Sequence, residues 1–424
     1  MEQSIQSQIK RDNQVKKFCL YGFLKNLKFF EPYLLVYLMS KDITLLEIGI
    51  LMTIRELVVN LLEIPSGIIA DYYGRKKELY LCFLFYIISF LAFFITDSFL
   101  LAAIAMIFFG CGEAFRSGSH KAMIYTYLDH KGWTSEKAFT YGRTRSVALI
   151  GSAISSIFGI ILIVLAPTTG HIFLFSAIPY TLDFLLITTY PNFLDKGDKK
   201  EGDKFFDVIK GFFQNIKENS SIKKLLLQEG LTESCLSYSK EFLQPLLEFT
   251  IISSGIVLAS LLSEEDNVNV ILGIAYAIMN LISSFAAKKA HILQNFTSNA
   301  SCLRWIQGSL CLLFITLSMT YGNFILVILL YLAIFALQSI RKPLYLEEVD
   351  NHSKKEHRAT VLSVAAQMKS LCLMIFAPIF GYIAEFFGLL QVLWMISGLL
   401  LLCFLFTSLN EKPHTTCKKK GITK

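Results

Sequence analysis

The sequence predicts an all-α, polytopic membrane protein with twelve helices arranged as two bundles of six. Hydrophobic residues make up 54% of the 424-residue chain and charged residues only 17%. Apolar stretches of about twenty residues recur along the whole length, and each is long enough to cross a bilayer as a helix. A polar stretch near the middle of the chain separates the first six of these stretches from the last six.

The twelve candidate spans have boundaries that the sequence sets to within several residues. In chain order they cover residues 18–39, 45–70, 78–96, 99–126, 143–166, 171–190, 224–251, 267–287, 302–320, 323–344, 360–385 and 388–408.

The Lys and Arg residues predict the orientation of the chain. Most of the 40 basic residues fall in alternate loops, in the tails and at the span ends beside them, whereas Lys41 lies in a loop on the other side. Short cytoplasmic loops are enriched in Lys and Arg. We therefore expect both termini to be cytoplasmic.

Five regions follow from this arrangement. We expect a cytoplasmic N-terminal tail at 1–17, an N-terminal six-helix bundle at 18–190 and a cytoplasmic connector at 191–223. A C-terminal six-helix bundle at 224–409 and a basic cytoplasmic tail at 410–424 complete the chain.

The connector contains apolar residues at helical spacing with lysines between them. Such a pattern is typical of an amphipathic helix on a membrane surface, although a plain linker is the alternative. The apolar residues are Phe205, Val208, Ile209, Phe212, Phe213 and Ile216.

Several classes of partner are not indicated. The nine cysteines are scattered and form no CxxC or Cys/His cluster, so neither a disulfide framework nor a metal site is expected. No Walker A loop occurs, and no other cofactor site is expected. The net charge of +7 lies in the short loops and does not indicate nucleic acid.

The loop after the second span carries one acid, one glycine and three bases in the sequence GIIADYYGRKK, residues 67–77. Gly74 permits a turn, Gly67 permits close helix packing, and Asp71 can pair with Arg75 or cap the next helix. The pattern resembles the loop signature of the major facilitator superfamily, G-x-x-x-D-x-x-G-R-[RK]. An ordinary positively charged loop between two membrane helices is the alternative.

Further stretches extend this resemblance over about residues 17–409. The sequence GEAFRSGS at 112–119 and the sequence RATVLS at 358–363 are similar to the fourth and eleventh helices of a bacterial branch whose substrates are poorly assigned. The resemblance implies the fold of the superfamily and a bacterial inner membrane as the location.

A faint internal repeat relates the two predicted halves. The first span contains FFEPYL from Phe29 and the seventh contains FLQPLL from Phe242, so that Glu31 aligns with Gln244 and Pro32 with Pro245. Parallel repeats of six helices are the architecture of the superfamily, in which helices 1 and 7 are counterparts.

Charged residues inside the spans are the candidate functional residues, because a charge in the bilayer is costly unless it is paired or faces water. The resemblance implies that helices 1, 4, 7 and 10 line a central cavity. We expect substrate contacts from the residues Lys25, Lys28, Glu31, Arg116, Lys240, Gln244 and Lys369. The alternative is that these charges pair with one another and lock the bundle.

Two buried carboxylates, Glu113 and Glu233, are candidate proton carriers, because burial favours the neutral form of an acid. His120 is interpreted as a packed side chain, with a proton relay as the alternative. The resemblance implies a cytoplasmic gate formed by the residues Gly67, Asp71, Gly74, Arg75, Lys76, Arg143 and Arg358.

These features predict a secondary active transporter that moves a small, anionic or zwitterionic solute by alternating access, driven by protons. Two alternatives remain open: an efflux pump for amphiphilic compounds, and a receptor or assembly partner that does not transport. An enzyme is not expected, since the spans contain no nucleophile–base set. The expected partners are the solute, the coupling ion and the lipid bilayer, and we expect a monomer.

Overall fold

The structure is a computed structural model that describes residues 5–116, 119–195, 220–255, 263–294, 298–352 and 358–408. Within these ranges the chain is helical and contains no β-strand. Most of the connector, residues 196–219, and the basic tail lie outside the described residues. The amphipathic surface helix expected there therefore stays a prediction.

The first half of the chain holds nine α-helices and two short 3₁₀ segments in its described residues. They are α1 (Ile5–Arg11), α2 (Asn13–Lys25), α3 (Leu34–Met39), α4 (Leu45–Tyr73), α5 (Arg75–Phe94), α6 (Phe99–Arg116), α7 (Ser119–His130), η1 (Thr134–Glu136), α8 (Lys137–Leu165), α9 (His171–Thr188) and η2 (Asn192–Asp195).

The second half holds six long helices in its described residues. They are α11 (Ser220–Ser254), α12 (Glu264–Gln294), α13 (Asn299–Met319), α14 (Phe324–His352), α15 (Arg358–Phe387) and α16 (Leu389–Ser408).

These helices confirm the all-α polytopic fold, and each predicted span coincides with helical structure. In the described residues, eight helices are long and apolar enough to cross a membrane when they are considered singly. Helices α4 and α11 are long enough but carry charged side chains along their length. Charges inside these two helices are therefore the first places to look for function.

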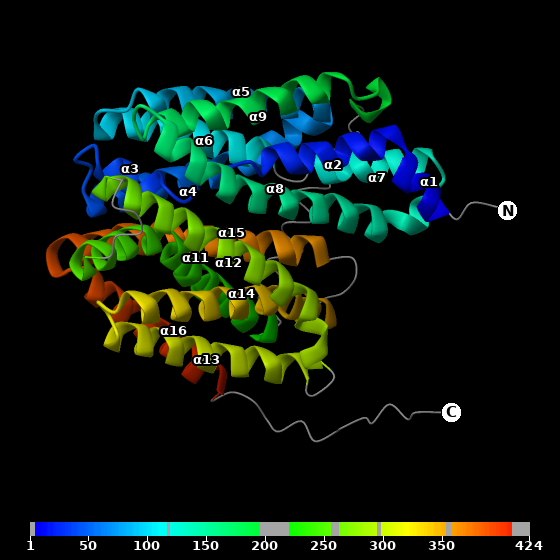
Figure 1. Cartoon of the computed structure of the whole chain (residues 1–424). Coiled ribbons are helices and arrows are strands. Elements are labelled where there is room, and N and C mark those ends of the chain that lie inside the picture. The colour runs from blue at the N-terminus through cyan, green and yellow to red at the C-terminus, as the bar shows by residue number, and fades with distance from the viewer. Residues whose placement is uncertain are drawn as a thin grey trace.

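The two halves lie one above the other in Figure 1, with α1–α9 in the upper bundle and α11–α16 in the lower one. Several helix pairs join them: α15 packs along α4, α12 packs along α8, and α11 contacts α3. We call the end of the bundle that holds Gly74, between α4 and α5, the loop end, and the other the opposite end. Helices α8 and α12 diverge toward the loop end in Figure 1.

Close contact between the halves is concentrated toward the opposite end. A Cβ atom added at Gly49 of α4 would overlap the backbone carbonyl of Ala377 in α15, and one at Gly381 would lie 2.5 Å from the carbonyl oxygen of Leu45. Glycine at both positions lets the two backbones touch. The Glu385 carboxylate also accepts a hydrogen bond from the Leu45 amide, with an N···O distance of 3.0 Å.

The first predicted span is not one continuous helix, which corrects the expectation for residues 18–39. Helix α2 ends at Lys25, and the chain runs without regular helix until α3 begins at Leu34. Pro32 lies in this break: it has no N–H to donate, and it disfavours helical geometry at Glu31 before it. Glu31 therefore lies in irregular backbone rather than on a helix face.

The loop after α4 contains the expected tight turn. Gly74 has a φ of 107°, a conformation that favours glycine, and a Cβ there would collide with Asp195. The Lys76 amide donates to the Asp195 carboxylate at 2.8 Å, and the Arg75 guanidinium donates to the Thr126 hydroxyl at 3.0 Å. These contacts join the loop to α7 and η2 of its own half.

Among the described residues, Gly67 has no close neighbour, so its predicted role in helix packing stays a prediction. A Cβ at Gly67 would meet no described atom within 4 Å. Gly67 lies near the loop end of α4, beyond the part of that helix that touches α15. The described structure places the Asp71 backbone in α4, but its side chain and that of Arg358 lie outside the described residues. Their predicted interactions stay predictions.

The close approach of α4 and α15 is testable with Gly49→Ala. The added methyl group must displace backbone rather than a flexible side chain, so we expect a loss of roughly 1–3 kcal/mol in stability. The measurement is the thermal unfolding of the purified protein in detergent. The matched control is Gly398→Ala in α16, where a Cβ meets open space and alanine favours the helix. Equal melting temperatures for the two variants would contradict the described contact.

Candidate functional site

Two adjoining chambers lie between the halves. The larger has a volume of about 560 Å³ and the smaller of about 350 Å³. Arg55 of α4, Glu241 of α11 and Lys369 of α15 line both chambers, so they form the wall that the chambers share. Volumes of this size are typical of pockets for small molecules.

The break in the first span is held by side chains from the other half. The Gln244 amide nitrogen of α11 donates to the Glu31 carbonyl oxygen at 3.0 Å, and its oxygen accepts from the Leu35 amide at 2.8 Å. The Lys240 ammonium lies 2.6 Å from a Glu31 carboxylate oxygen. Tyr276 of α12 supports this arrangement by donating to the Lys240 carbonyl at 2.8 Å. We call these contacts of residues 31, 35, 240 and 244 the cross-half joint.

The acid and base of α6 are paired within the first half. The Arg116 guanidinium lies 2.7 Å from the Glu113 carboxylate. The Tyr86 hydroxyl of α5 donates to Glu113, and Arg116 donates to the same hydroxyl at 3.4 Å. Both charged residues line the larger chamber. Helical spacing i, i+3 brings them together, and each charge has a partner at the cavity wall.

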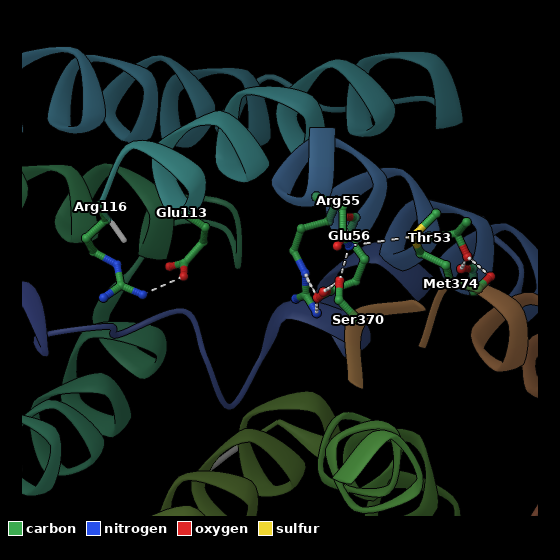
Figure 2. Close-up of polar contacts among 9 residues, drawn as sticks. Thr53, Arg55, Glu56, Glu113, Arg116, Ser370 and Met374 are labelled. Atoms are coloured by element: carbon green, nitrogen blue, oxygen red, sulfur yellow. Dashed lines mark hydrogen bonds and ion pairs between the residues drawn. The ribbon is translucent and has the colours of Figure 1, made fainter. Parts of the chain in front are cut away.

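A second charged pair lies on α4. Figure 2 shows Arg55, Glu56 and Ser370 grouped together, apart from the pair of Arg116 and Glu113. Arg55 lies 3.0 Å from one Glu56 carboxylate oxygen, and the Ser370 hydroxyl donates to the other at 2.5 Å. Asn60 donates to that serine hydroxyl. The group connects α4 with α15 at the cavity wall.

The second half contains a buried charge cluster of its own. Arg341 of α14 lies 2.6 Å from Glu229 and 3.6 Å from Glu233 of α11, and Lys342 lies 3.0 Å from Glu233. Gln338 donates to Glu233 at 2.9 Å. Only 4% of the Arg341 side chain and 7% of that of Glu233 are exposed. Two bases and two acids therefore compensate one another within α11 and α14.

Three charged side chains of the cavity have no ion-pair or hydrogen-bond partner among the described residues. They are Lys28, Lys369 and Glu241. Lys28 from the first half of the protein and Lys369 from the second half line the larger chamber, and Glu241 lines both chambers. Two cations and one anion thus remain available to a solute.

The predicted substrate residues divide into two groups. Lys28, Glu31, Arg116 and Lys369 line the larger chamber, and Lys240 lines the smaller one. Lys25 and Gln244 line neither, and Gln244 is completely buried in the cross-half joint.

The predicted proton carriers and His120 lie in different surroundings. Glu113 lines the larger chamber, whereas Glu233 is buried behind the smaller one, whose wall contains its partners Gln338 and Lys342. His120 does not share the cavity face with Glu113. Its ring stacks on that of Tyr21 with a centroid distance of 3.6 Å, as a packed side chain.

Several residues that line or support the chambers are not among those that the sequence predicts. Arg341 and Lys342 read as basic residues at the inner end of a span, although their position on the tenth span is a signal. Glu241 follows Lys240 directly, and no pattern in the sequence distinguishes it. Tyr86 carries no charge, so no sequence pattern marked it.

Metal binding is not indicated by the described residues, which contain no group of three or more His, Cys, Asp or Glu side chains placed around one point. The site instead consists of charged side chains around the two chambers, some in ion pairs and some without a partner among the described residues.

Known proteins share the sequence and the fold to different extents. Residues 19–373 match the family model of the Major Facilitator Superfamily. The uncharacterized MFS-type transporter YxaM of Bacillus subtilis (strain 168) is 36% identical over 90 residues, which cover 21% of this chain and 23% of that protein. The match therefore spans about a quarter of the relative's length.

Solved structures match over nearly the full length. The nucleoside transporter NupG has a TM-score of 0.77 at 12% identity, with 95% of this chain and 100% of that chain covered. A bacterial homolog of the human lysosomal transporter Spinster, in an inward-facing and occupied conformation, has a TM-score of 0.71 at 14% identity, with 95% and 97% covered. A D-xylose–proton symporter has a TM-score of 0.68 at 11% identity, with 93% and 96% covered. These structures show a shared fold.

The cross-half joint predicts that Gln244→Leu is destabilising. Leucine fills a similar volume but leaves the Leu35 amide, the Glu31 carbonyl and the Tyr276 hydroxyl without this partner. Because unsatisfied buried groups each cost about 1–3 kcal/mol, we expect a lower melting temperature in detergent. Ser237→Ala, on the same helix and at the wall of the smaller chamber, is the control. If the Gln244→Leu protein had the same melting temperature as the control, a structural role for this amide would be excluded.

Proposed function

The chain belongs to the Major Facilitator Superfamily, and from this premise we propose that it is a secondary active transporter for a small solute with an anionic group, either alone or in a zwitterion. Members of this family are transporters rather than enzymes, and the chain is a multi-pass membrane protein. The solute, the coupling ion and the direction of transport belong to the proposal.

The observation that supports this substrate class is the pair of lysines at the larger chamber. Lys28 comes from the first half and Lys369 from the second, and neither ammonium group has a partner among the described residues. A carboxylate or phosphate between them would contact both halves at once. Glu241 on the shared wall would accept a hydrogen bond from the amine of a zwitterion.

Alternating access is supported by where the halves touch. The hydrogen bonds from Thr53 to Met374 and from Thr169 to Glu265 join the halves toward the opposite end. The chambers lie on the loop-end side of the Gly49 contact. With both termini cytoplasmic, as we propose, this conformation presents its cavity to the cytoplasm.

The paired acids support a role for protons in our proposal. An anionic solute that approaches Arg116 competes with Glu113 for the guanidinium. A Glu113 carboxylate released from this pair loses its compensating charge and becomes a better proton acceptor. Glu233 would act likewise if Lys342 and Arg341 turned away from it. Solute binding and protonation would then favour each other.

A cytoplasmic gate remains part of the proposal. Arg75 and Lys76 are bonded within their own half in this conformation, and Arg143 is partly buried in α8. Closure at the loop end would bring these bases and Asp71 toward the second half. Gly67, which has no described atom within 4 Å of an added Cβ, would then allow a close helix contact.

An efflux pump for amphiphilic compounds is the second candidate, and one observation favours it. The aromatic rings of Phe30, Phe93 and Phe109 line the larger chamber beside its charges. Rings of this kind bind the apolar part of a lipophilic cation, with Glu241 as the counter-charge.

A thermal-shift screen distinguishes the two candidates. Purified protein in detergent is heated with a panel of organic anions, zwitterions and lipophilic cations at several pH values. We expect an anion or zwitterion to stabilise the protein, and Lys369→Gln and Lys28→Gln each to weaken its apparent affinity about 10- to 100-fold, because each removes one charge-assisted hydrogen bond.

The control for this screen is Lys16→Gln, an exposed lysine on α2 away from both chambers, which should behave like the wild type. Stabilisation by lipophilic cations alone would replace the anion proposal with drug efflux. An unchanged anion affinity in both lysine variants would exclude these lysines from the site.

Transport itself is tested with Arg116→Gln in proteoliposomes, with the stabilising anion as the solute. We expect uptake to be abolished, because the guanidinium is the charge for which solute and Glu113 compete. The single variant leaves the Glu113 carboxylate without its partner. The double variant Glu113→Gln/Arg116→Gln removes both charges and therefore serves as the control for this effect. Unchanged uptake in the single variant would contradict the proposed role.

A further inference from the structure

Asp183 of α9 is a carboxyl group that the proposed transport mechanism does not yet use. Its side chain is 0% exposed, and neither carboxyl oxygen has a hydrogen-bond partner among the described residues. It lies five residues before the end of α9, about 8 Å along the helix axis. An ionised carboxylate in this state would cost several kcal/mol.

The groups around Asp183 come from three neighbouring elements. Tyr180 lies one turn earlier on α9, and its hydroxyl and that of Tyr21 on α2 are also buried without a partner. Both tyrosines lie near enough to Asp183 to interact with it electrostatically, as do Lys25 of α2 and Tyr190 beyond α9.

The other elements packed against α9 add further titratable groups. The buried titratable side chains of helix α5 are Lys76, Glu78, Cys82 and Tyr86, and the Tyr86 ring lies 5.0 Å from that of Tyr180. The charged side chains of α8 are Lys137, Arg143 and Arg145, all within its first three turns. No acidic side chain of α8 faces Asp183, since that helix contains none.

The surroundings favour a proton over a metal cation as the species that neutralises Asp183. Two phenol hydroxyls offer one oxygen each, which is fewer oxygen ligands than a hard cation normally takes. Lys25 adds a positive charge that repels a second cation. A protonated carboxyl group, in contrast, is neutral, so its burial without a partner costs far less than that of a carboxylate.

Asp183 differs in this respect from the two predicted proton carriers. Glu113 has Arg116 and the Tyr86 hydroxyl as partners, and Glu233 has Lys342, Arg341 and Gln338. Those partners stabilise the ionised form of each glutamate. Asp183 has no comparable partner in this conformation, so no hydrogen bond or ion pair among the described residues stabilises its ionised form.

We infer that Asp183 is a proton-binding site behind the cavity wall, occupied by a proton in the conformation described here. The proton resides on one carboxyl oxygen. When it leaves, the resulting carboxylate is neutralised by Lys25, which also interacts with Glu113 at the cavity. Lys25 thus connects this site with the pair that a solute would disturb.

This inference deepens the proposed function and rests on it for its role in coupling, but its occupancy can be tested alone. Infrared difference spectroscopy of the purified protein in detergent at pH 7 detects the C=O stretch of a buried protonated carboxyl group. We expect the band in the wild type, its loss in Asp183→Asn and its retention in the control Glu113→Gln. Asparagine is a neutral isostere, so the variant should fold.

Three outcomes would overturn the inference. A band that persists in Asp183→Asn, or no such band in the wild type, would mean that Asp183 is not protonated. A band lost in Glu113→Gln would place the proton on Glu113. Loss of the wild-type band when sodium chloride replaces choline chloride at constant pH would assign the site to a metal cation.

Uptake assays on the same preparations separate this inference from the proposed function. The probe is the anion that stabilises the protein in the thermal-shift screen. No uptake in wild-type proteoliposomes, with the Asp183 band present, would reject the transport function and leave the protonation site standing. Uptake in wild type without an Asp183 band would reject only the protonation site.

Discussion

The cross-half joint is the interaction on which the rest of the arrangement depends. Pro32 interrupts the first membrane-spanning helix and frees backbone groups that cannot find water inside a bilayer. Gln244 and Lys240 of the other half supply the missing partners. Because of this joint, Glu31 faces the larger chamber and Lys240 the smaller one. The break therefore exists only as part of the assembled pair of halves.

Charge pairing divides the molecule into units that can move. Glu113 with Arg116 lies wholly within the first half, and Glu229 and Glu233 with Arg341 lie wholly within the second. A rotation of one half against the other leaves these pairs intact. It would break cross-half contacts such as Leu45 with Glu385 near the opposite end and Ser370 with Glu56 at the cavity wall. The ion pair of Glu31 with Lys240 also joins the halves, so rocking must move about this joint or exchange its partners.

The sequence predicts the spans well, because a length of about twenty apolar residues is a local property. The break at Pro32 was not predictable, since Pro245 has the same local pattern yet lies inside the continuous helix α11. What differs is the partner across the interface. Similarly, the sequence marks Arg341 only as a base at the end of a span, and its ion pair with Glu229 is visible only in the folded structure. The sequence shows Asp183 as one acid in an apolar stretch, and only the structure shows that its carboxyl oxygens have no hydrogen-bond partner among the described residues.

Glu31 and Gln244, which the repeat aligns with each other, are in direct contact across the interface. Positions near a twofold axis must be complementary to their own copies, as in a symmetric dimer. A glutamate in place of Gln244 could not donate to the Glu31 carbonyl oxygen, because a carboxylate only accepts. The glutamine amide donates to that oxygen and accepts from the Leu35 amide. The difference between the two aligned positions thus gives the single chain a directional contact that two glutamates could not form.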